Sequence, residues 1–286
     1  MRTTRLAAVF GAIVLALTTA ACGGDGDDAG SGSSGGASGI VGKASGGKLV
    51  VGVKNDQPGL GLQTGNTYTG FDVEIAKIIA AGLGIPADKI VYTETPSRIR
   101  EDVIVNNQVD LVVATYTIND ARKERVSFAG PYYQAGQDIM VASDNTTITG
   151  PDSLRPTNAQ VCSVSGSTPA KNLEQYMDVA NIVLFDVYSK CADALRNGQV
   201  EAVSTDNVIL LGLIEASSGA FKLVDQPFTE EPYGIGIPKG DVAFCEFINA
   251  TLQEAAANGT YQQAWESTAG KVAPEAPTLP TADACS

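Results

Sequence analysis

Short apolar runs alternate with amphipathic stretches along the chain from about Lys48. Runs rich in β-branched side chains predict strands, and apolar residues spaced three and four apart predict helices between them. The predicted strands are 48–53, 90–93, 111–114, 137–143, 159–164, 182–185, 200–205, 221–224 and 233–238. The predicted helices are 71–83, a short one from about 99, 188–196, 208–216, 242–257 and 261–267. This alternation is typical of an α/β fold.

Polar side chains follow directly after the apolar run 111–114. Thr115 and Thr117 supply hydroxyls, and Arg122 supplies a planar guanidinium whose shape matches a carboxylate. Because open α/β sheets bind ligands at the carboxyl ends of their strands, these residues predict a clamp for an anion. Arg122 alone also suits a solvated surface position.

A second copy of this pattern begins 91 residues further on. Residues 106–112 (NNQVDLV) align with 197–203 (NGQVEAV), and each copy reads as a helix end, a turn and a buried strand. In this register Thr115 matches Asp206. Chance similarity in a chain rich in Ala and Val is the alternative, but both copies end their strand in a polar residue. The repeat predicts two lobes that share one cleft.

A helix start follows the predicted strand 159–164. Thr168 suits the N-cap position, and Pro169 suits the first helical position. The free NH groups and the positive end of the helix dipole would then face an anion. An ordinary cap without a ligand fits the same residues.

Residues 1–21 have the composition of a secretory signal. Arg2 and Arg5 precede the apolar run 6–17, which is too short to span a membrane. Cys22 follows directly, and this junction resembles a bacterial lipobox, in which the cysteine is lipidated and becomes the mature amino terminus. Plain secretion with an unmodified Cys22 is the alternative.

Residues 23–47 consist almost only of Gly, Ser, Asp and Ala, which predicts a flexible tether. We expect the lipid and the tether to hold the globular body at the outer face of the cell membrane. The predicted divisions are a signal peptide at 1–21, a lipid-anchored linker at 22–47, lobe 1 at 48–140 and 233–270, lobe 2 at 141–232, and a Pro-rich tail at 271–286.

The chain is strongly acidic and contains no histidine. Its formal net charge of -13 becomes -15 when Arg2 and Arg5 are removed, because 17 basic residues then stand against 32 acidic ones. This charge argues against nucleic acid as a partner. The lack of histidine excludes Ser-His-Asp and Cys-His catalysis and histidine-bound zinc. We expect neither a cofactor nor a metal.

Four cysteines remain once Cys22 is assigned to lipid. In an exported and therefore oxidising setting they are expected to form disulfides, and three pairings are possible. We favour two local pairs, Cys162 with Cys191 and Cys245 with Cys285, because the second would fasten the Pro-rich tail to the last helices. Free buried thiols are the alternative.

Several stretches carry a resemblance to a known family. They are GFDVEIA at 70–76, the segment 110–133 with its ERVSFAGPYY ending, SGST at 165–168, GQVEAVSTD at 198–206 and NGTYQQAW at 258–265. Together they resemble the amino-acid-binding family of bacterial extracellular solute-binding proteins, the receptors of polar amino-acid ABC importers. Residues 53–59, 96–97 and 100–101 look like those of glutamate-binding lipoproteins from Gram-positive bacteria.

The resemblance implies a two-lobed periplasmic-binding-protein fold of type II, with the ligand cleft between the lobes and a two-strand hinge. It also implies which residues hold the ligand. The α-carboxylate would be bound by Arg122, Thr117 and the NH groups of Ser167 and Thr168. The α-ammonium would be bound by Asp206 and the Thr115 region.

The side chain of the ligand is predicted from departures from the family pattern. Lys54 stands where an acid is common, and Gln57 stands where an aromatic ring is common. With Arg100, Lys54 favours an anionic side chain, because a neutral one would leave these cations partly unpaired. Glutamate is the first expectation and aspartate the second. Glutamine is the nearest rival, and Lys54 at the surface or Arg100 in a structural role are the alternatives to this interpretation.

Two other classes of function remain open on the sequence. Some exported dehydratases share this fold, but they need a carboxylate as general acid, and no candidate stands out. The second class is a sensory module that feeds a receptor, but no signalling segment follows the closing helices. We therefore expect a monomeric lipoprotein, not an enzyme, that delivers its amino acid to an ABC permease and its ATPase.

Overall fold

The computed structural model describes residue 39, residues 47–273 and residues 275–286. The predictions for the signal peptide 1–21, for Cys22 and for most of the linker lie outside these residues. Within the described part of the chain, no helix is both long enough and apolar enough to cross a membrane.

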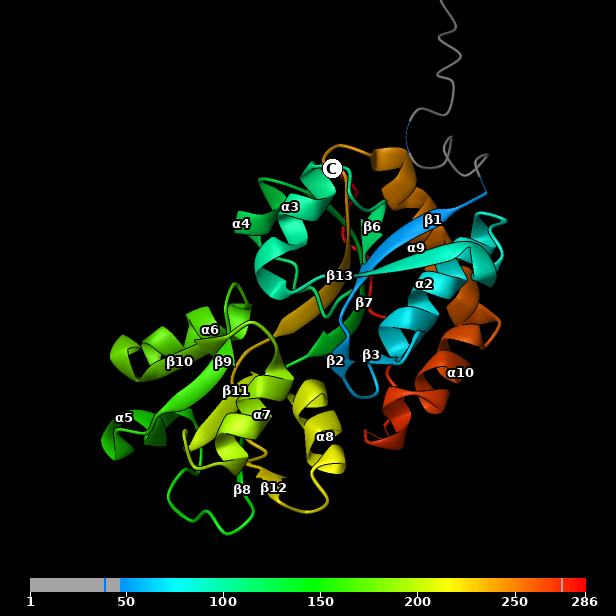
Figure 1. Cartoon of the computed structure of the whole chain (residues 1–286). Coiled ribbons are helices and arrows are strands. Elements are labelled where there is room, and N and C mark those ends of the chain that lie inside the picture. Colours follow the sequence, from blue (N-terminus) through cyan, green and yellow to red (C-terminus); the bar gives the residue numbers. More distant parts are fainter. Residues whose placement is uncertain (1–38, 40–46, 274) are drawn as a thin grey trace, which may run out of the picture. The chain divides into compact units, whose positions relative to one another are not determined.

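The first of two large sheets has the strand order β5–β1–β6–β13–β7 (Figure 1). β1 runs parallel to β5 and β6, whereas β13 runs antiparallel to β6 and β7. The strands are β1 (Leu49–Val53), β5 (Ile90–Glu94), β6 (Leu111–Val112), β7 (Ser127–Ala135) and β13 (Glu231–Ile237). The helices of this lobe are α2 (Phe71–Gly82), α3 (Arg100–Val105), α4 (Asp120–Lys123), α9 (Val242–Ala257) and α10 (Thr260–Ser267).

The second sheet has the order β10–β9–β11–β8–β12. Its strands are β8 (Gln137–Ala142), β9 (Val161–Val164), β10 (Ile182–Phe185), β11 (Ala202–Asp206) and β12 (Phe221–Leu223). The helices of this lobe are α5 (Leu154–Thr157), α6 (Thr168–Asn172), α7 (Tyr188–Arg196) and α8 (Asn207–Ala216). The two sheets with their helices form the two-lobed α/β fold of type II that the resemblance implied.

Short elements that the apolar pattern did not predict complete the fold. A small sheet contains β2 (Asp56–Gln57), β3 (Gly61–Thr64) and β4 (Thr67–Thr69). Single 3-10 turns cover Ala87–Lys89, Ser97–Ile99, Pro151–Ser153, Leu173–Gln175, Val179–Asn181 and Ala269–Lys271. Runs of two to four residues carry too little periodicity to be recognised in a sequence.

The predicted repeat is confirmed by the two sheets. β6 lies between a parallel neighbour, β1, and an antiparallel neighbour, β13, and β11 likewise lies between parallel β9 and antiparallel β8. The turn before each strand has the same conformation, because aligned residues Asn107 and Gly198 have φ angles of 54° and 67°. The aligned polar residues therefore lie at corresponding places, Thr115 just beyond β6 and Asp206 at the end of β11.

The repeat extends to a side-chain contact. Asp110, just before β6, accepts a hydrogen bond from the backbone NH of Val50 at 2.8 Å. Its aligned partner Glu201 accepts one from the backbone NH of Gln160. Each acid thus tethers its strand to the neighbouring one, and this argues against chance similarity.

The chain leaves the first sheet at Gly136, between β7 and β8. β8 lies within the second sheet, so the chain crosses a few residues before the predicted boundary at residue 140. β7 itself was not predicted, because Gly130 and Pro131 interrupt its pattern. β7 is an edge strand, and its register with β13 shifts around these residues, so the missing NH of Pro131 breaks no ladder bond.

Both predicted disulfides are confirmed. The Cα atoms are 5.5 Å apart in Cys162–Cys191 and 5.8 Å apart in Cys245–Cys285. The second bond fastens the C-terminal segment to α9, and Ser127 donates to the carbonyl of Ser286 at 2.6 Å. By loop-closure entropy each disulfide stabilises the fold by about 3 to 4 kcal/mol.

Candidate functional site

A small cavity lies between residues of the two lobes. Its volume is about 10 Å³, so an amino acid does not fit in it in this arrangement of the lobes. The residues that line it are Ser97, Arg100, Thr115, Thr117, Ser167, Thr168, Pro169, Tyr188, Asp206 and Ile209. Six of the eight predicted ligand-binding residues are among them, and the other two, Lys54 and Arg122, hydrogen-bond to lining residues.

Thr115 forms a tight turn just beyond β6. Its φ angle of 45° is uncommon for a residue with a branched Cβ, so other contacts must hold it. The backbone NH of Thr115 donates to Asp72 at 2.9 Å, and Tyr132 donates to the same carboxylate at 2.7 Å. Burial raises the pKa of Asp72 to about 6. The turn directs the carbonyls of Ala114 and Thr115 toward Arg100.

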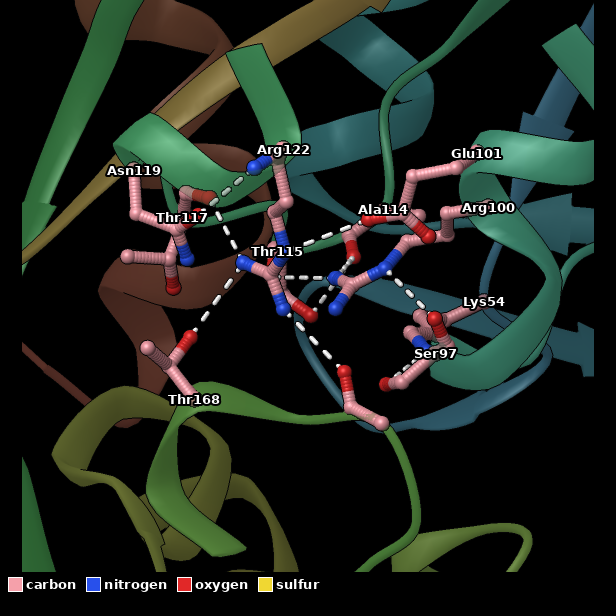
Figure 2. A network of polar contacts seen from close by, with 11 residues as sticks. Lys54, Ser97, Arg100, Glu101, Ala114, Thr115, Thr117, Asn119, Arg122 and Thr168 are labelled. Carbon is pink, nitrogen blue, oxygen red and sulfur yellow. Dashed lines mark hydrogen bonds and ion pairs between the residues drawn. The ribbon is translucent and has the colours of Figure 1, made fainter. Parts of the chain in front are cut away.

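Arg100 is held at the edge of the cavity and is only 2% exposed. One of its terminal nitrogens donates to the carbonyls of Ala114 and Thr115, at 3.0 and 2.9 Å (Figure 2). Its Nε donates to the carbonyl of Ser97 at 3.3 Å, and its guanidinium lies 4.3 Å from the centre of the Tyr116 ring. All of these partners are uncharged.

Lys54 follows β1 and is 4% exposed. Its Nζ donates to the hydroxyl of Ser97 at 2.8 Å (Figure 2). Burial lowers the pKa of Lys54 well below its ordinary value, and the charge of Arg100 lowers it further. Within the described residues, neither Lys54 nor Arg100 forms an ion pair with a carboxylate.

Arg122 joins the two lobes. One terminal nitrogen donates to the carbonyl of Thr117 at 2.6 Å and to the hydroxyl of Thr168 at 3.2 Å, and the other donates to the carbonyl of Gly166 at 3.1 Å (Figure 2). Its Nε lies 3.3 Å from Glu101, which makes an ion pair. Burial lowers the pKa of Arg122 to about 10, so it stays cationic at neutral pH.

The N-terminus of α6 differs from the prediction in one residue. The N-cap is Ser167, whose side chain accepts from the backbone NH of Ala170 at 3.1 Å, and not Thr168. Thr168 is the first helical residue, so its hydroxyl is available to accept from Arg122. Serine and threonine cap helices almost equally well, and the sequence could not separate two neighbouring candidates.

Asp206 ends β11 and is 2% exposed. Its Oδ2 accepts from the hydroxyl of Tyr233 at 2.6 Å, while its Oδ1 is buried without a hydrogen-bond partner among the described residues. Burial raises the pKa of Asp206 to about 8, and the nearby charge of Glu231 adds to the shift. An ammonium group at Oδ1 would satisfy this oxygen and reverse the shift.

The sequence did not reveal the residues that support the site. Asp72, in the first turn of α2, is fully buried beneath Thr115. Glu101 pairs with Arg122, and Tyr233 holds Asp206. The only signal was that Asp72 and Glu101 lie in stretches that resemble the family, and such a signal gives no contact.

Raising the pH from about 5 to about 8 is expected to destabilise the ligand-free protein through Asp206. Because its pKa is raised to about 8, the folded state keeps a proton that the unfolded chain has already released, so the free energy of unfolding falls as the pH rises. Thermal unfolding of the wild type and of Asp206→Asn across this range measures the effect. The variant should show the smaller decline, and equal declines would contradict the assignment.

The profile of the bacterial extracellular solute-binding proteins, family 3, matches residues 49–269. The chain belongs to this family. This solute-binding protein is 38% identical over 271 residues to the glutamate-binding protein GluB of Corynebacterium efficiens, which covers 91% of this chain and 89% of that protein. It is 34% identical over 221 residues to the ABC transporter glutamine-binding protein GlnH of Bacillus subtilis, covering 77% of this chain and 80% of that one.

The solved structures agree with the fold. An ancestral arginine-binding protein bound to arginine superposes with a TM-score of 0.72 at 32% identity, over 78% of this chain and 98% of that one. Members of the family bind amino acids and deliver them to ABC permeases, so this solute-binding protein is an amino-acid receptor of an ABC importer. Because the relatives are named for different amino acids, the ligand has to be argued from the site.

Proposed function

We propose that this receptor captures an acidic amino acid, glutamate ahead of aspartate, and delivers it to the permease and ATPase of an ABC importer. The observation that carries the proposal is the pair of buried cations, Lys54 and Arg100. Arg100 lines the cavity, Lys54 donates to Ser97, which lines it, and the hydrogen-bond partners of both cations are uncharged. In a chain with net charge -13, two buried cations that form no ion pair within the described part of the chain are best explained by an anionic ligand.

The energies favour glutamate over a neutral side chain. An incompletely paired buried charge costs about 2 to 5 kcal/mol, and a hydrogen bond to a charged group returns about 1.5 to 3 kcal/mol. A side-chain carboxylate beside Lys54 would also restore the charged state that burial and Arg100 disfavour. A carboxamide offers an acceptor but no charge, so it gains less from the same contacts.

The backbone of the ligand would be held at the interface between the lobes. In this proposal, Arg122, Thr117 and the α6 start at Ser167 and Thr168 bind the α-carboxylate. Asp206 binds the α-ammonium with its unpaired oxygen, and the Thr115 turn lies beside it. Since these residues come from both lobes, ligand binding and lobe closure would occur together.

A dehydratase is the second candidate, because Asp206 is a buried carboxyl whose raised pKa would suit a general acid. The same pKa is also expected of a carboxylate that awaits an ammonium partner, and the family consists of solute-binding proteins. We therefore infer a receptor and not an enzyme. Incubation with a prephenate-type substrate decides between them, since a receptor forms no product.

The proposal includes attachment to the membrane. Lipidation at Cys22 and the linker would hold a monomeric receptor at the outer face of the cell membrane, close to its permease. Cys22 lies outside the described residues, so the argument rests on the sequence. Mass spectrometry of the mature protein would show a lipid on Cys22, and an unmodified amino terminus would contradict the anchor.

Isothermal titration of the purified protein with glutamate, aspartate and glutamine tests the ligand. We expect glutamate to bind tightest, aspartate next, and glutamine at least tenfold more weakly than glutamate, about 1.4 kcal/mol. Glutamine binding as tightly as glutamate would contradict the acidic-ligand proposal. Binding of none of the three would also remove the assignment of the site.

A further inference from the structure

Both crossings between the lobes are short. The segment that returns from the second lobe is hydrogen-bonded to β8 as far as Phe228, whose NH donates to the carbonyl of Gln137 at 2.9 Å. Directly afterwards Glu231 pairs with Ala135 in the first sheet. Only Gly136 on one crossing and residues 229–230 on the other therefore connect the two lobes, and any change of lobe angle concentrates there.

A buried polar network spans this hinge. Glu231, at the start of β13, is 1% exposed, and its Oε1 accepts from the side chains of Asn172 and Thr229, each at 3.0 Å. Nδ2 of Asn172 also donates to Oε1 of Gln137 at 3.0 Å. Glu231 belongs to the first lobe, whereas Asn172 and Gln137 belong to the second, so the contact between Glu231 and Asn172 exists only while the lobes are close.

The network also fixes the helix that faces the ligand. Gln137 donates to the carbonyl of Pro169 at 3.1 Å and to the hydroxyl of Ser204 at 2.9 Å. Asn172 is the last residue of α6, and Thr168, its first, accepts from Arg122. One short helix thus connects the hinge network at its C-terminal end with the cavity at its N-terminal end.

We propose that Glu231, Asn172 and Gln137 form a closure latch, a set of hydrogen bonds across the hinge that stabilises the closed lobes whichever amino acid is bound. This inference rests on the proposed receptor function. Because the latch residues do not line the cavity, the latch acts on the fraction of receptor in the binding-competent closed form, and apparent affinity scales with that fraction. Glu231 is therefore a positioning residue and not a ligand-binding one.

Variants of Asn172 test the latch. Asn172→Ala removes the bridging donor, and the loss of one hydrogen bond to a charged group is expected to raise the Kd of every bound amino acid about tenfold. Asn172→Asp places a second carboxylate against Glu231, so its effect should be larger. Glu231→Gln keeps an acceptor for Asn172, so through the latch it should raise the Kd less than Asn172→Ala does. Glu246→Gln, an exposed acid on α9, is the control for lost charge.

The readouts separate a latch from a general structural defect. Stopped-flow binding should show that the Asn172 variants release ligand faster, by the same factor for glutamate, aspartate and glutamine. Effects that differ among the three ligands, or unchanged release rates in both Asn172 variants, would overturn the latch.

Hydrogen exchange of the backbone amides, measured on the ligand-free proteins, tests the latch without relying on ligand binding. If none of the amino acids binds wild type, the proposed function fails, and exchange then decides the latch alone. Faster exchange in α6 of Asn172→Asp than in wild type or Glu246→Gln supports the latch. Equal exchange in the three proteins overturns it.

Discussion

Replacing Arg122 by alanine is expected to weaken the binding of every amino-acid ligand alike, by about 2 to 5 kcal/mol. The α-carboxylate is common to all amino acids, and Arg122 is the cation beside Thr117 and Thr168 at the closed interface. Without it, the bound carboxylate and the partly buried Glu101 would both lose their cation. Asp206→Ala should cost a similar amount, because it leaves the α-ammonium unpaired.

A neighbouring arginine provides the matched control. Arg125 lies three residues after Arg122, but its side chain is half exposed and pairs with Asp102. Arg125→Ala should therefore leave affinity nearly unchanged, since exposed ion pairs contribute at most about 1 kcal/mol. Calorimetry on the three variants, with thermal unfolding to confirm folding, measures the effect. A loss below about 0.5 kcal/mol for Arg122→Ala or Asp206→Ala would mean that the α-group site is misplaced.

The framework of the fold could be predicted from the sequence because it follows from apolar periodicity. α7 (Tyr188–Arg196) and α9 (Val242–Ala257) begin and end where their patterns do. β7 could not be predicted, since Gly130 and Pro131 are tolerated only because β7 lies at the edge of its sheet, and strand order is not a local property.

Most of the residues predicted for the site lie together at one cavity, but the contacts that support them were not predicted. Thr115 and Asp206 were found together because the repeat aligns them. The burial of Asp72, the pairing of Glu101 with Arg122 and the latch at Glu231 all depend on residues distant in sequence. No pattern along one strand or helix contains such contacts, so they required the three-dimensional arrangement.

Changing Lys54 or Arg100 to methionine is expected to weaken the binding of glutamate far more than the binding of glutamine. Only glutamate carries the charge that these cations match, and each lost charge-assisted contact is worth about 1.5 to 3 kcal/mol. Arg100→Met also removes hydrogen bonds to the Ala114 and Thr115 carbonyls, so it should lower the affinity for both ligands. Lys54→Met, whose Nζ donates to Ser97, is the cleaner variant. Lys89→Met, an exposed lysine in the same lobe, is the control.

The difference between the two ligands is the quantity to read, because specificity is a difference of affinities and about 1.4 kcal/mol is a factor of ten. A general disturbance of the cleft lowers both affinities together and leaves this difference unchanged. Loss of a matched charge instead reduces the difference.

Calorimetric titration of wild type and of the Lys54→Met/Arg100→Met double variant, each with glutamate and with glutamine, tests the acidic-ligand site most directly. We predict that wild type prefers glutamate and that the double variant narrows or inverts this preference. An equal loss of affinity for glutamate and glutamine would contradict the acidic-ligand site. Lys54 and Arg100 would then support the fold or the binding of the α-groups, and would not match the charge of the ligand's side chain.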